Sequence, residues 1–170
     1  AFYRAHMHTA VDRPSLRRLR RACAAVVSEA LGRPVTVEAL LEALVFTPFE
    51  DTAPALRAAR AAGIRLVVVS NWDVSLHEVL ARSGLDALLD GAISSAECGA
   101  AKPDPAPLRR GLRLARVAAP DAWLVGDTPE ADVAGARAAG VTPVLLDRDG
   151  TLAARPGGAR VIRSLAELPS

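Results

Sequence analysis

Hydrophobic residues follow one spacing in the first quarter of the chain and another in the rest. Up to about residue 44 they recur every three or four positions, which is the spacing of one helix face. Helices are predicted over residues 14–31, where Gly32 supplies the stop, and over residues 37–45, where Thr36 can cap the first turn. No strand is expected in this part of the chain.

From about residue 52 onward, short apolar runs alternate with helical segments. Strands are predicted at residues 64–69, 91–95, 122–125, 142–146 and 161–162, and helices at residues 53–62, 73–82, 105–117 and 129–139. Short apolar strands that alternate with helices of ten or more residues are typical of a parallel sheet covered on both faces. The pattern therefore predicts an α/β protein, whose chemistry should lie at the carboxyl ends of its strands.

Composition and charge narrow the classes of partner. The 170 residues are 51% hydrophobic but only 4% aromatic, so the core must be built from Leu, Val and Ala. A net charge of +2 is too small to indicate nucleic-acid binding, and the dense run Arg17–Arg21 is interpreted as the wet face of a helix. No apolar run approaches the ~20 residues that span a bilayer. We expect a soluble, cytoplasmic protein without nucleic-acid or membrane partners.

Two carboxylates follow the third predicted strand. Gly126 and Asp127 end that strand, and Asp132 comes five positions after Asp127, in the first turns of the next helix. Two carboxylates at the end of a buried strand could form a site for a hard cation such as Mg²⁺. Capping of the helix is the alternative role, and it accounts for one carboxylate but not for both.

Polar residues at two other loops could serve the same site. Ser70 and Asn71 follow the first strand, where a hydroxyl and backbone N–H groups suit a phosphoryl oxygen. Lys102 lies beside Pro103, which limits its freedom and suits a fixed positive charge. Each feature also has an ordinary interpretation, as a strand exit and as a solvated lysine before a helix.

Taken in order, these elements resemble the haloacid dehalogenase superfamily. The residues that carry the resemblance are Ser70, Lys102-Pro103-Asp104, Gly126-Asp127-Thr128 with Asp132, and the small-residue helix 134–140. The resemblance covers about residues 46–168. It implies a Rossmann-like core over residues 48–170, and residues 1–47 resemble the end of the family's helical cap.

The resemblance also implies roles for the candidate residues. Ser70 and Asn71 would hold a transferring phosphoryl group, and Lys102 would bind it and offset the charge of an aspartate nucleophile. Asp127 would ligate Mg²⁺ together with that nucleophile, and Asp132 would complete or support the metal site. Lys102 and Asp127 are therefore the candidate catalytic residues. The family's nucleophile forms an aspartyl-phosphate, and a second aspartate acts as general acid and base.

The chain departs from the family's pattern in one respect. No strand that carries the family's Asp-x-Asp-Gly-Thr motif precedes the helical segment. Residues 147–151 match that motif letter for letter, but they follow the strand 142–146, where the family has another strand ending in a polar turn. Asp-Arg-Asp-Gly is good turn chemistry by itself. We therefore interpret Asp147 as a turn residue.

The interpretation we favour is a chain that lacks the amino-terminal part of the family's fold. The missing strand would lie mid-sheet, between the strands that end at Ser70 and Gly126. Its removal would leave two unpaired interior edges or a collapsed sheet. These 170 residues, expressed alone, are expected to be inactive and poorly folded, because loss of a covalent nucleophile costs on the order of 10⁶ in turnover in another hydrolase.

Three functions remain open at this stage. The first is a Mg²⁺-dependent phosphatase acting on a small phosphomonoester, which the pair Asp127 and Asp132 favours. The second is a haloacid dehalogenase, in which a similar nucleophile attacks carbon without a metal. The third is a non-catalytic module that keeps a phosphate pocket. Substrate identity is not encoded in any motif of the chain.

Overall fold

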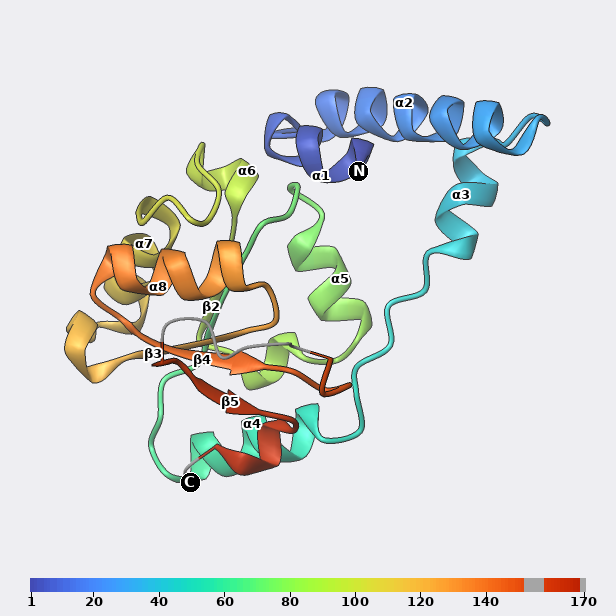
Figure 1. The fold of residues 1–170 in the computed structure, drawn as a ribbon. Helices are drawn as coiled ribbons and strands as arrows, with labels where there is room; N and C mark the ends of the chain where they lie inside the picture. The colour runs from blue at the N-terminus through green and yellow to red at the C-terminus, as the bar shows by residue number, and fades with distance from the viewer. Residues whose placement is uncertain (152–157, 169–170) are drawn as a thin grey trace.

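The amino-terminal helices form an arm that stands above the strands (Figure 1). The arm consists of α1 (Phe2–His6), the 3-10 turn η1 (Met7–Thr9), α2 (Arg13–Leu31) and α3 (Val37–Ala43). The structure is a computed structural model and describes residues 1–151 and 158–168. Both predicted helices of this part are present, and α3 ends two residues earlier than expected.

Strands and helices alternate through the rest of the chain, as the hydrophobic pattern predicts. The elements are α4 (Thr52–Ala61), β1 (Val67–Ser70), α5 (Leu76–Arg82), η2 (Asp86–Leu88), β2 (Gly91–Ser94), α6 (Ser95–Cys98), α7 (Ala106–Ala115), η3 (Ala119–Asp121), β3 (Trp123–Gly126), the π-helical turn η4 (Pro129–Val133), α8 (Ala134–Ala139), β4 (Thr142–Leu146), β5 (Arg160–Ile162) and η6 (Leu165–Glu167). The fold is of the α/β class with parallel strands, as expected.

Local chemistry explains where the arm's helices begin and end. Asp12 and Ser15 form a reciprocal capping box at the start of α2. Gly32 ends α2 in the left-handed conformation, with φ of 63°. The Thr36 side chain accepts a hydrogen bond from the Ala39 N–H at the start of α3. These signals are local in sequence, so sequence reasoning located the boundaries well.

One predicted helix start is wrong. The helix expected from Asp73 begins at Leu76 instead. The Asp73 carboxylate accepts from the Ser75 N–H at 2.7 Å, two residues on, and from the Tyr3 hydroxyl at 2.8 Å. A bond to the second following residue forms a local turn that competes with helix, so the helix starts after it.

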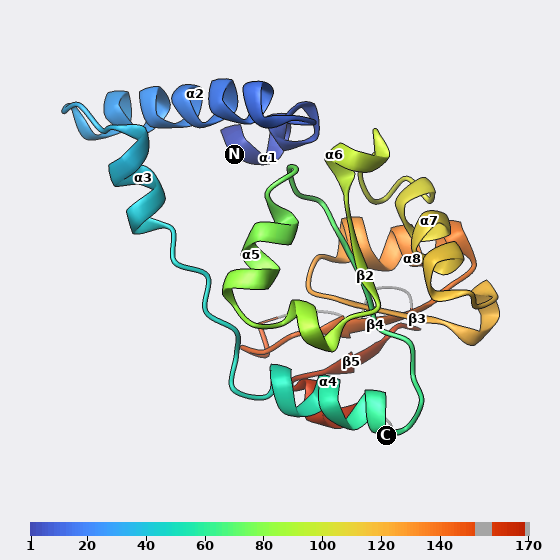
Figure 2. The ribbon, with the colours of Figure 1, turned by 180° about the vertical axis from the view of Figure 1, so that it is seen from behind.

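The strands form two parallel sheets within the described residues. β1 pairs with β2, and β3, β4 and β5 form a second sheet in that order. The described strands include no hydrogen-bonded pair that joins β1 to β3. In Figures 1 and 2, α8 lies on one side of the three-stranded sheet and α4 on the other. Two separate sheets, with β1 and β3 not paired to each other among the described strands, fit one of the two arrangements that the sequence predicted.

The arm touches the core through its first turns. Met7, Ala10, Leu16 and Leu19 form a buried cluster, against which Val74 of the core packs. The Val74 N–H donates to the Ala10 carbonyl at 3.2 Å, which adds a backbone bond to the apolar contact. Apolar residues further along α2, such as Leu31, are exposed. The arm is therefore anchored at one end only.

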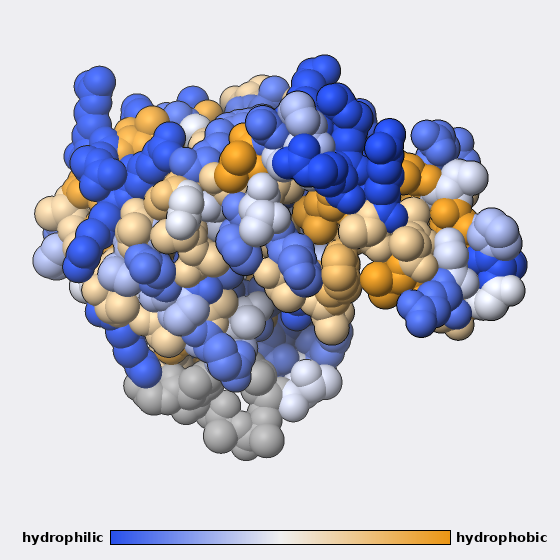
Figure 3. Space-filling model, turned by 90° about the horizontal axis from the view of Figure 1, so that it is seen from above, coloured by the Kyte–Doolittle hydropathy of each residue, from blue (hydrophilic) through white to orange (hydrophobic). Residues whose placement is uncertain are grey.

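The opposite face of α2 is polar. Arg17, Arg18 and Arg21 are exposed, whereas Leu16 and Leu19 are buried. Figure 3 shows this side of the molecule, where hydrophilic residues gather over the arm and hydrophobic residues are exposed beside them. The predicted wet face of this helix is confirmed. Among the described helices, none combines the length and the apolar character needed to cross a bilayer.

Candidate active site

The Lys102 ammonium joins the two sheets at their carboxyl ends. Its Nζ donates to the Val69 carbonyl of β1 at 2.7 Å and to Asp132 Oδ1 at 2.6 Å. Asp132 lies in η4, directly after β3. The side chains of Lys102 and Asp132 are only 9% and 8% exposed. The three loops that carry the sequence motifs therefore meet at one point.

Asn71 fixes the main chain of Lys102. Its Nδ2 donates to the Lys102 carbonyl at 2.9 Å, and its Oδ1 accepts from the Lys102 N–H at 2.8 Å. The two bonds place the end of β1 beside the lysine loop, 31 residues further along the chain. Gly135 of α8 lies close to this loop, since a Cβ there would be in ordinary van der Waals contact with Pro103 Cα, at 3.4 Å. The amide thus serves as a clamp between two loops.

Asp132 is a buried carboxylate with both oxygens engaged. Oδ1 accepts from Lys102, and Oδ2 accepts from the Thr128 N–H at 2.9 Å. The side chain packs over Gly126, where a Cβ would lie 2.2 Å from Asp132 Cγ. Glycine is therefore required at the end of β3, and a buried carboxylate is tolerable here because a cation and an N–H satisfy it.

Asp127 and Ser70 lie at the ends of β3 and β1. Asp127 is exposed, and the Thr128 hydroxyl donates to its Oδ1 at 3.4 Å. Ser70 is half-buried, and no described residue is a hydrogen-bond partner of its hydroxyl. Both groups thus remain available to a ligand at the rim where Lys102 lies.

The carboxylates do not by themselves form a metal centre. No group of three or more His, Cys, Asp or Glu side chains that could hold a metal occurs in residues 1–151 and 158–168. Direct coordination of a metal by Asp132 would require it to give up its bond to Lys102 or to Thr128. Asp127, being exposed, is the better placed of the two predicted ligands.

The structure supplies a positioning group that sequence reasoning did not identify. Ser95 is fully buried, and its hydroxyl binds both the Trp72 N–H at 3.1 Å and the Trp72 carbonyl at 3.0 Å. This bond pair holds the chain just after Asn71. No signal in the sequence marks Ser95, because the contact joins residues 23 positions apart.

Glu97 also has a structural role that the sequence did not suggest. Burial favours the neutral acid, but bonds from the Ser94 N–H and hydroxyl and from His77 outweigh it, so the pKa of Glu97 lies below its usual range. Its carboxylate completes a capping box with Ser94 at the start of α6. A Ser-x-x-Glu spacing was the signal that could have located this cap.

Asp147 is a turn residue, as the sequence predicted. It follows β4, its N–H donates to the Ile162 carbonyl at 2.8 Å, and its Oδ1 accepts from the Thr151 N–H at 3.1 Å. Gly150 has φ of 66°, which suits a turn. β4 is the middle strand of its sheet, paired with β3 and β5, and β1 belongs to the other sheet. The motif-like letters therefore belong to a turn after a strand whose two edges are already paired.

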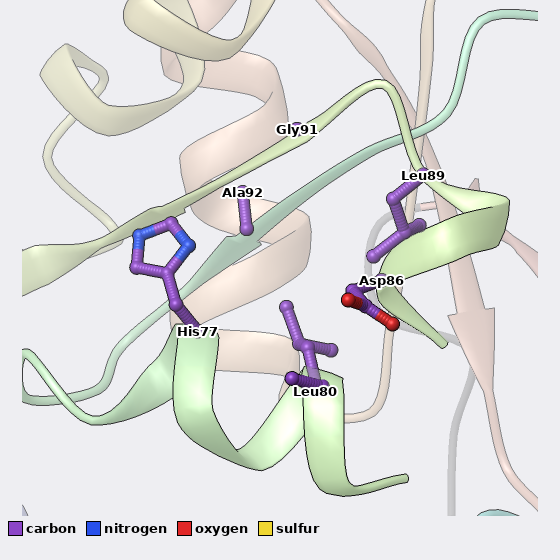
Figure 4. A pocket seen from close by; sticks show the side chains of 7 residues that line it. His77, Leu80, Asp86, Leu89, Gly91 and Ala92 are labelled. Atoms are coloured by element: carbon purple, nitrogen blue, oxygen red, sulfur yellow. The ribbon is translucent and has the colours of Figure 1, made fainter. Parts of the chain in front are cut away.

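A separate hollow of about 320 Å³ lies between α5, η2 and β2 (Figure 4). Its lining includes His77, Leu80, Asp86 and Leu89, but neither Ser70 nor any residue of the lysine loop. His77 Nε2 lies 2.9 Å from Glu97 Oε1. This hollow is distinct from the site around Lys102.

Comparison with known proteins agrees with the resemblance seen in the sequence. Residues 7–140 match the family model of the haloacid dehalogenase-like hydrolases. The chain is 35% identical over 128 residues to a phosphoserine phosphatase of Thermus thermophilus, which covers 72% of this chain and 51% of that protein. The chain thus spans about half the length of this curated relative.

Solved structures agree in fold. A haloacid dehalogenase-type phosphatase from Thermococcus onnurineus superposes with a TM-score of 0.68 over 97% of this chain and 86% of that one, at 23% identity. A 2-haloacid dehalogenase from Pseudomonas syringae superposes with a TM-score of 0.58 over 69% of this chain and 50% of that one, at 32% identity. With the family model matching most of its length, the chain belongs to the haloacid dehalogenase-like hydrolases.

Proposed function

We propose that the protein is a phosphatase that hydrolyses a small phosphomonoester at the rim formed by Ser70, Lys102 and Asp127. The observation that carries the proposal is the buried Lys102 ammonium, fixed between the Val69 carbonyl and Asp132. A fixed cation of this kind stabilises the charge of a transferring phosphoryl group without reorganisation. Phosphatases among the relatives support the same reaction class.

Lys102 has a donor left for a ligand. An ammonium group has three N–H donors, and two of them bind Val69 and Asp132. In the proposed function the third donates to a phosphoryl oxygen, and the Ser70 hydroxyl with the Asn71 backbone holds another. Asp132 orients the ammonium through its hydrogen bond. The site would therefore bind a phosphate group through donors that the fold has already placed.

The nucleophile is proposed to be an aspartate on a segment upstream of these 170 residues. A strand added between β1 and β3 would end beside Lys102, which bonds to Val69 of β1 and to Asp132 just after β3, since parallel strands present their carboxyl ends at one rim. Its carboxylate would attack phosphorus, the ester bond would break, and the alcohol would leave. Water would then hydrolyse the acyl phosphate. Without that segment, the 170 residues are predicted to be inactive.

Mg²⁺ is the proposed cofactor, and Asp127 together with the upstream carboxylate would hold it. The exposed Asp127 carboxylate fits an oxygen-seeking cation, and Asp132 would support the site through the Thr128 N–H beside Asp127. The ion would supply charge neutralisation for the phosphoryl oxygens.

The test is phosphate release by the full-length product of the gene from a panel of phosphomonoesters. Asp127→Asn and Lys102→Ala are expected to lower kcat at least 100-fold, because each removes a group that binds the developing charge. Asp121→Asn is the matched control, since Asp121 is exposed and precedes the opposite end of β3. Equal activity in Asp127→Asn and Asp121→Asn would refute the assignment.

Dehalogenation is the second candidate, because the relative from Pseudomonas syringae is a 2-haloacid dehalogenase at 32% identity. A dehalogenase would release chloride from 2-chloropropionate, and the full-length product should then do so in the presence of a metal chelator. Phosphate release that stops on chelation, without chloride release, would support the phosphatase and exclude this alternative.

A further inference from the structure

Three aromatic rings meet at Trp72, the residue that follows Asn71 of the candidate site. The Tyr3 and Trp72 ring centroids are 6.4 Å apart, and those of Phe46 and Trp72 are 5.1 Å apart, both edge to face. The chain has only six Phe, Tyr and Trp residues, so half of them gather here. They come from α1, from the linker between α3 and α4, and from the loop after β1. Such a concentration in an aromatic-poor chain indicates a specific use.

Trp72 is tied to the phosphoryl-binding loops. It directly follows Asn71, whose side chain clamps the Lys102 main chain. The Ser95 hydroxyl fixes the Trp72 main chain on both its N–H and its carbonyl. The indole Nε1 donates to the Ser75 hydroxyl at 3.4 Å. Hydrogen bonds thus fix the Trp72 main chain and the indole Nε1, and the ring contacts Tyr3 and Phe46.

The cluster presents no free charge. The Tyr3 hydroxyl donates to Asp73, which is only 3% exposed. Burial, followed by the negative charge of Asp73, raises the pKa of Tyr3 far above its usual range, so the phenol stays neutral. Phe46 has no polar side-chain atom and is 50% exposed. The exposed Phe46 ring packs on Trp72, which follows the Asn71 that is bonded to the Lys102 main chain, and aromatic surface so linked to a fixed cation suits a ligand with one anionic and one apolar end.

We propose that Phe46 and Trp72 form the specificity wall for the leaving group, and that the substrate is the phosphomonoester of an apolar alcohol, an aromatic one above all. This inference rests on the proposed function. The phosphoryl end would lie at Lys102 and Ser70, and the alcohol would pack on the rings of Phe46 and Trp72. Contact between two aromatic rings is more favourable than burial of the same apolar area alone. Phosphomonoesters of aromatic alcohols should therefore bind more tightly than those of aliphatic alcohols.

The test is calorimetric titration of the full-length gene product with two phosphonates that cannot be hydrolysed. Phenylphosphonate is expected to bind about 10-fold more tightly than methylphosphonate, in line with an added aromatic contact. Phe46→Ala should reduce that preference to about twofold or less. Phe49→Ala is the matched control, because Phe49 lies on the same linker and is 63% exposed, but it packs on Arg148. It should keep the full preference.

The outcomes separate the two proposals. Equal binding of both phosphonates, or a phenyl preference that survives in Phe46→Ala, overturns the specificity wall and leaves the phosphatase assignment standing. Binding of neither phosphonate overturns the phosphatase assignment and the wall with it. Because Phe46 is half exposed and makes no side-chain hydrogen bond, its replacement should leave the fold intact, which circular dichroism would verify.

Discussion

Two ion pairs join distant parts of this molecule, and their surroundings differ. Lys102 and Asp132 are 2.6 Å apart and less than a tenth exposed, at the rim between the sheets. Arg148 and Asp51 are 2.9 Å apart and about a fifth exposed, and they tie the start of α4 to the turn after β4. The first pair is buried and its ammonium has a spare donor, whereas in the second the Asp51 carboxylate is fully engaged by groups of the protein.

The Arg148–Asp51 pair holds segments of the core together. The Asp51 carboxylate accepts hydrogen bonds from two Arg148 nitrogens, from the Ser164 hydroxyl at 2.7 Å and from the Leu165 N–H at 2.8 Å. The guanidinium also lies 4.0 Å from the centroid of the Phe49 ring. The Asp51 carboxylate is thus fully engaged by protein donors, which indicates a structural role. The Lys102 pair differs from it in being more deeply buried, at the carboxyl ends of the strands.

The largest expected difference between the pairs is in stability. Lys102→Met leaves a buried carboxylate without its cation and should lower the free energy of unfolding by about 3–5 kcal/mol. Arg148→Met should cost about 1–2 kcal/mol, because Asp51 keeps two donors and is partly solvated. Urea unfolding of the two variants, made in the full-length gene product, measures both values. A larger loss for Arg148→Met would reverse the ranking that burial predicts.

A smaller effect tests whether Gly126 is energetically coupled to the Lys102–Asp132 pair. Gly126→Ala places a Cβ against Asp132 and should cost about 1–3 kcal/mol through overpacking. Combined with Lys102→Met, the loss should be less than the sum, because both changes disturb the same carboxylate. Combined with Arg148→Met, the losses should add. If the losses for Gly126→Ala and Lys102→Met were additive in the same urea experiments, Gly126 would not be coupled to the Lys102–Asp132 pair.

The smallest effect is a pH dependence that belongs to the second pair. Hydrogen bonds from Arg148 and then from Ser164 hold the pKa of Asp51 well below its usual range. A lowered pKa in the folded state stabilises the protein above the unfolded pKa of about 4, and this stability is lost as the pH falls below that value.

Asp51→Asn should therefore cost about 1 kcal/mol at pH 7, and the difference from the parent should shrink toward pH 2. Thermal melts at several pH values measure this difference. Asp149→Asn, in the exposed turn beside Arg148, is the control and should show no such trend. A difference that stays constant with pH would mean that the Asp51 charge does not contribute.

The helices and strands of this chain were predictable because their signals are local. Gly32 and Thr36 mark helix ends through the conformation and the hydrogen bonds of one or two neighbouring residues. The run Thr142–Leu146 was predicted with its observed bounds, since a short apolar run between two turns admits few alternatives. The helix expected from Asp73 starts later because the Asp73 carboxylate accepts from the Ser75 N–H and forms a local turn in its place.

By itself, the sequence determined the α/β class, the order of elements and the three loops that carry polar side chains, because periodicity and turn chemistry act within a few residues. Only the tertiary structure decided that Lys102 pairs with Asp132, that Asn71 clamps the lysine loop, and that the described strands β1 and β3 belong to separate sheets. These facts depend on contacts across about thirty or more residues. Their geometry is set by how sheets and helices pack, which local patterns do not encode.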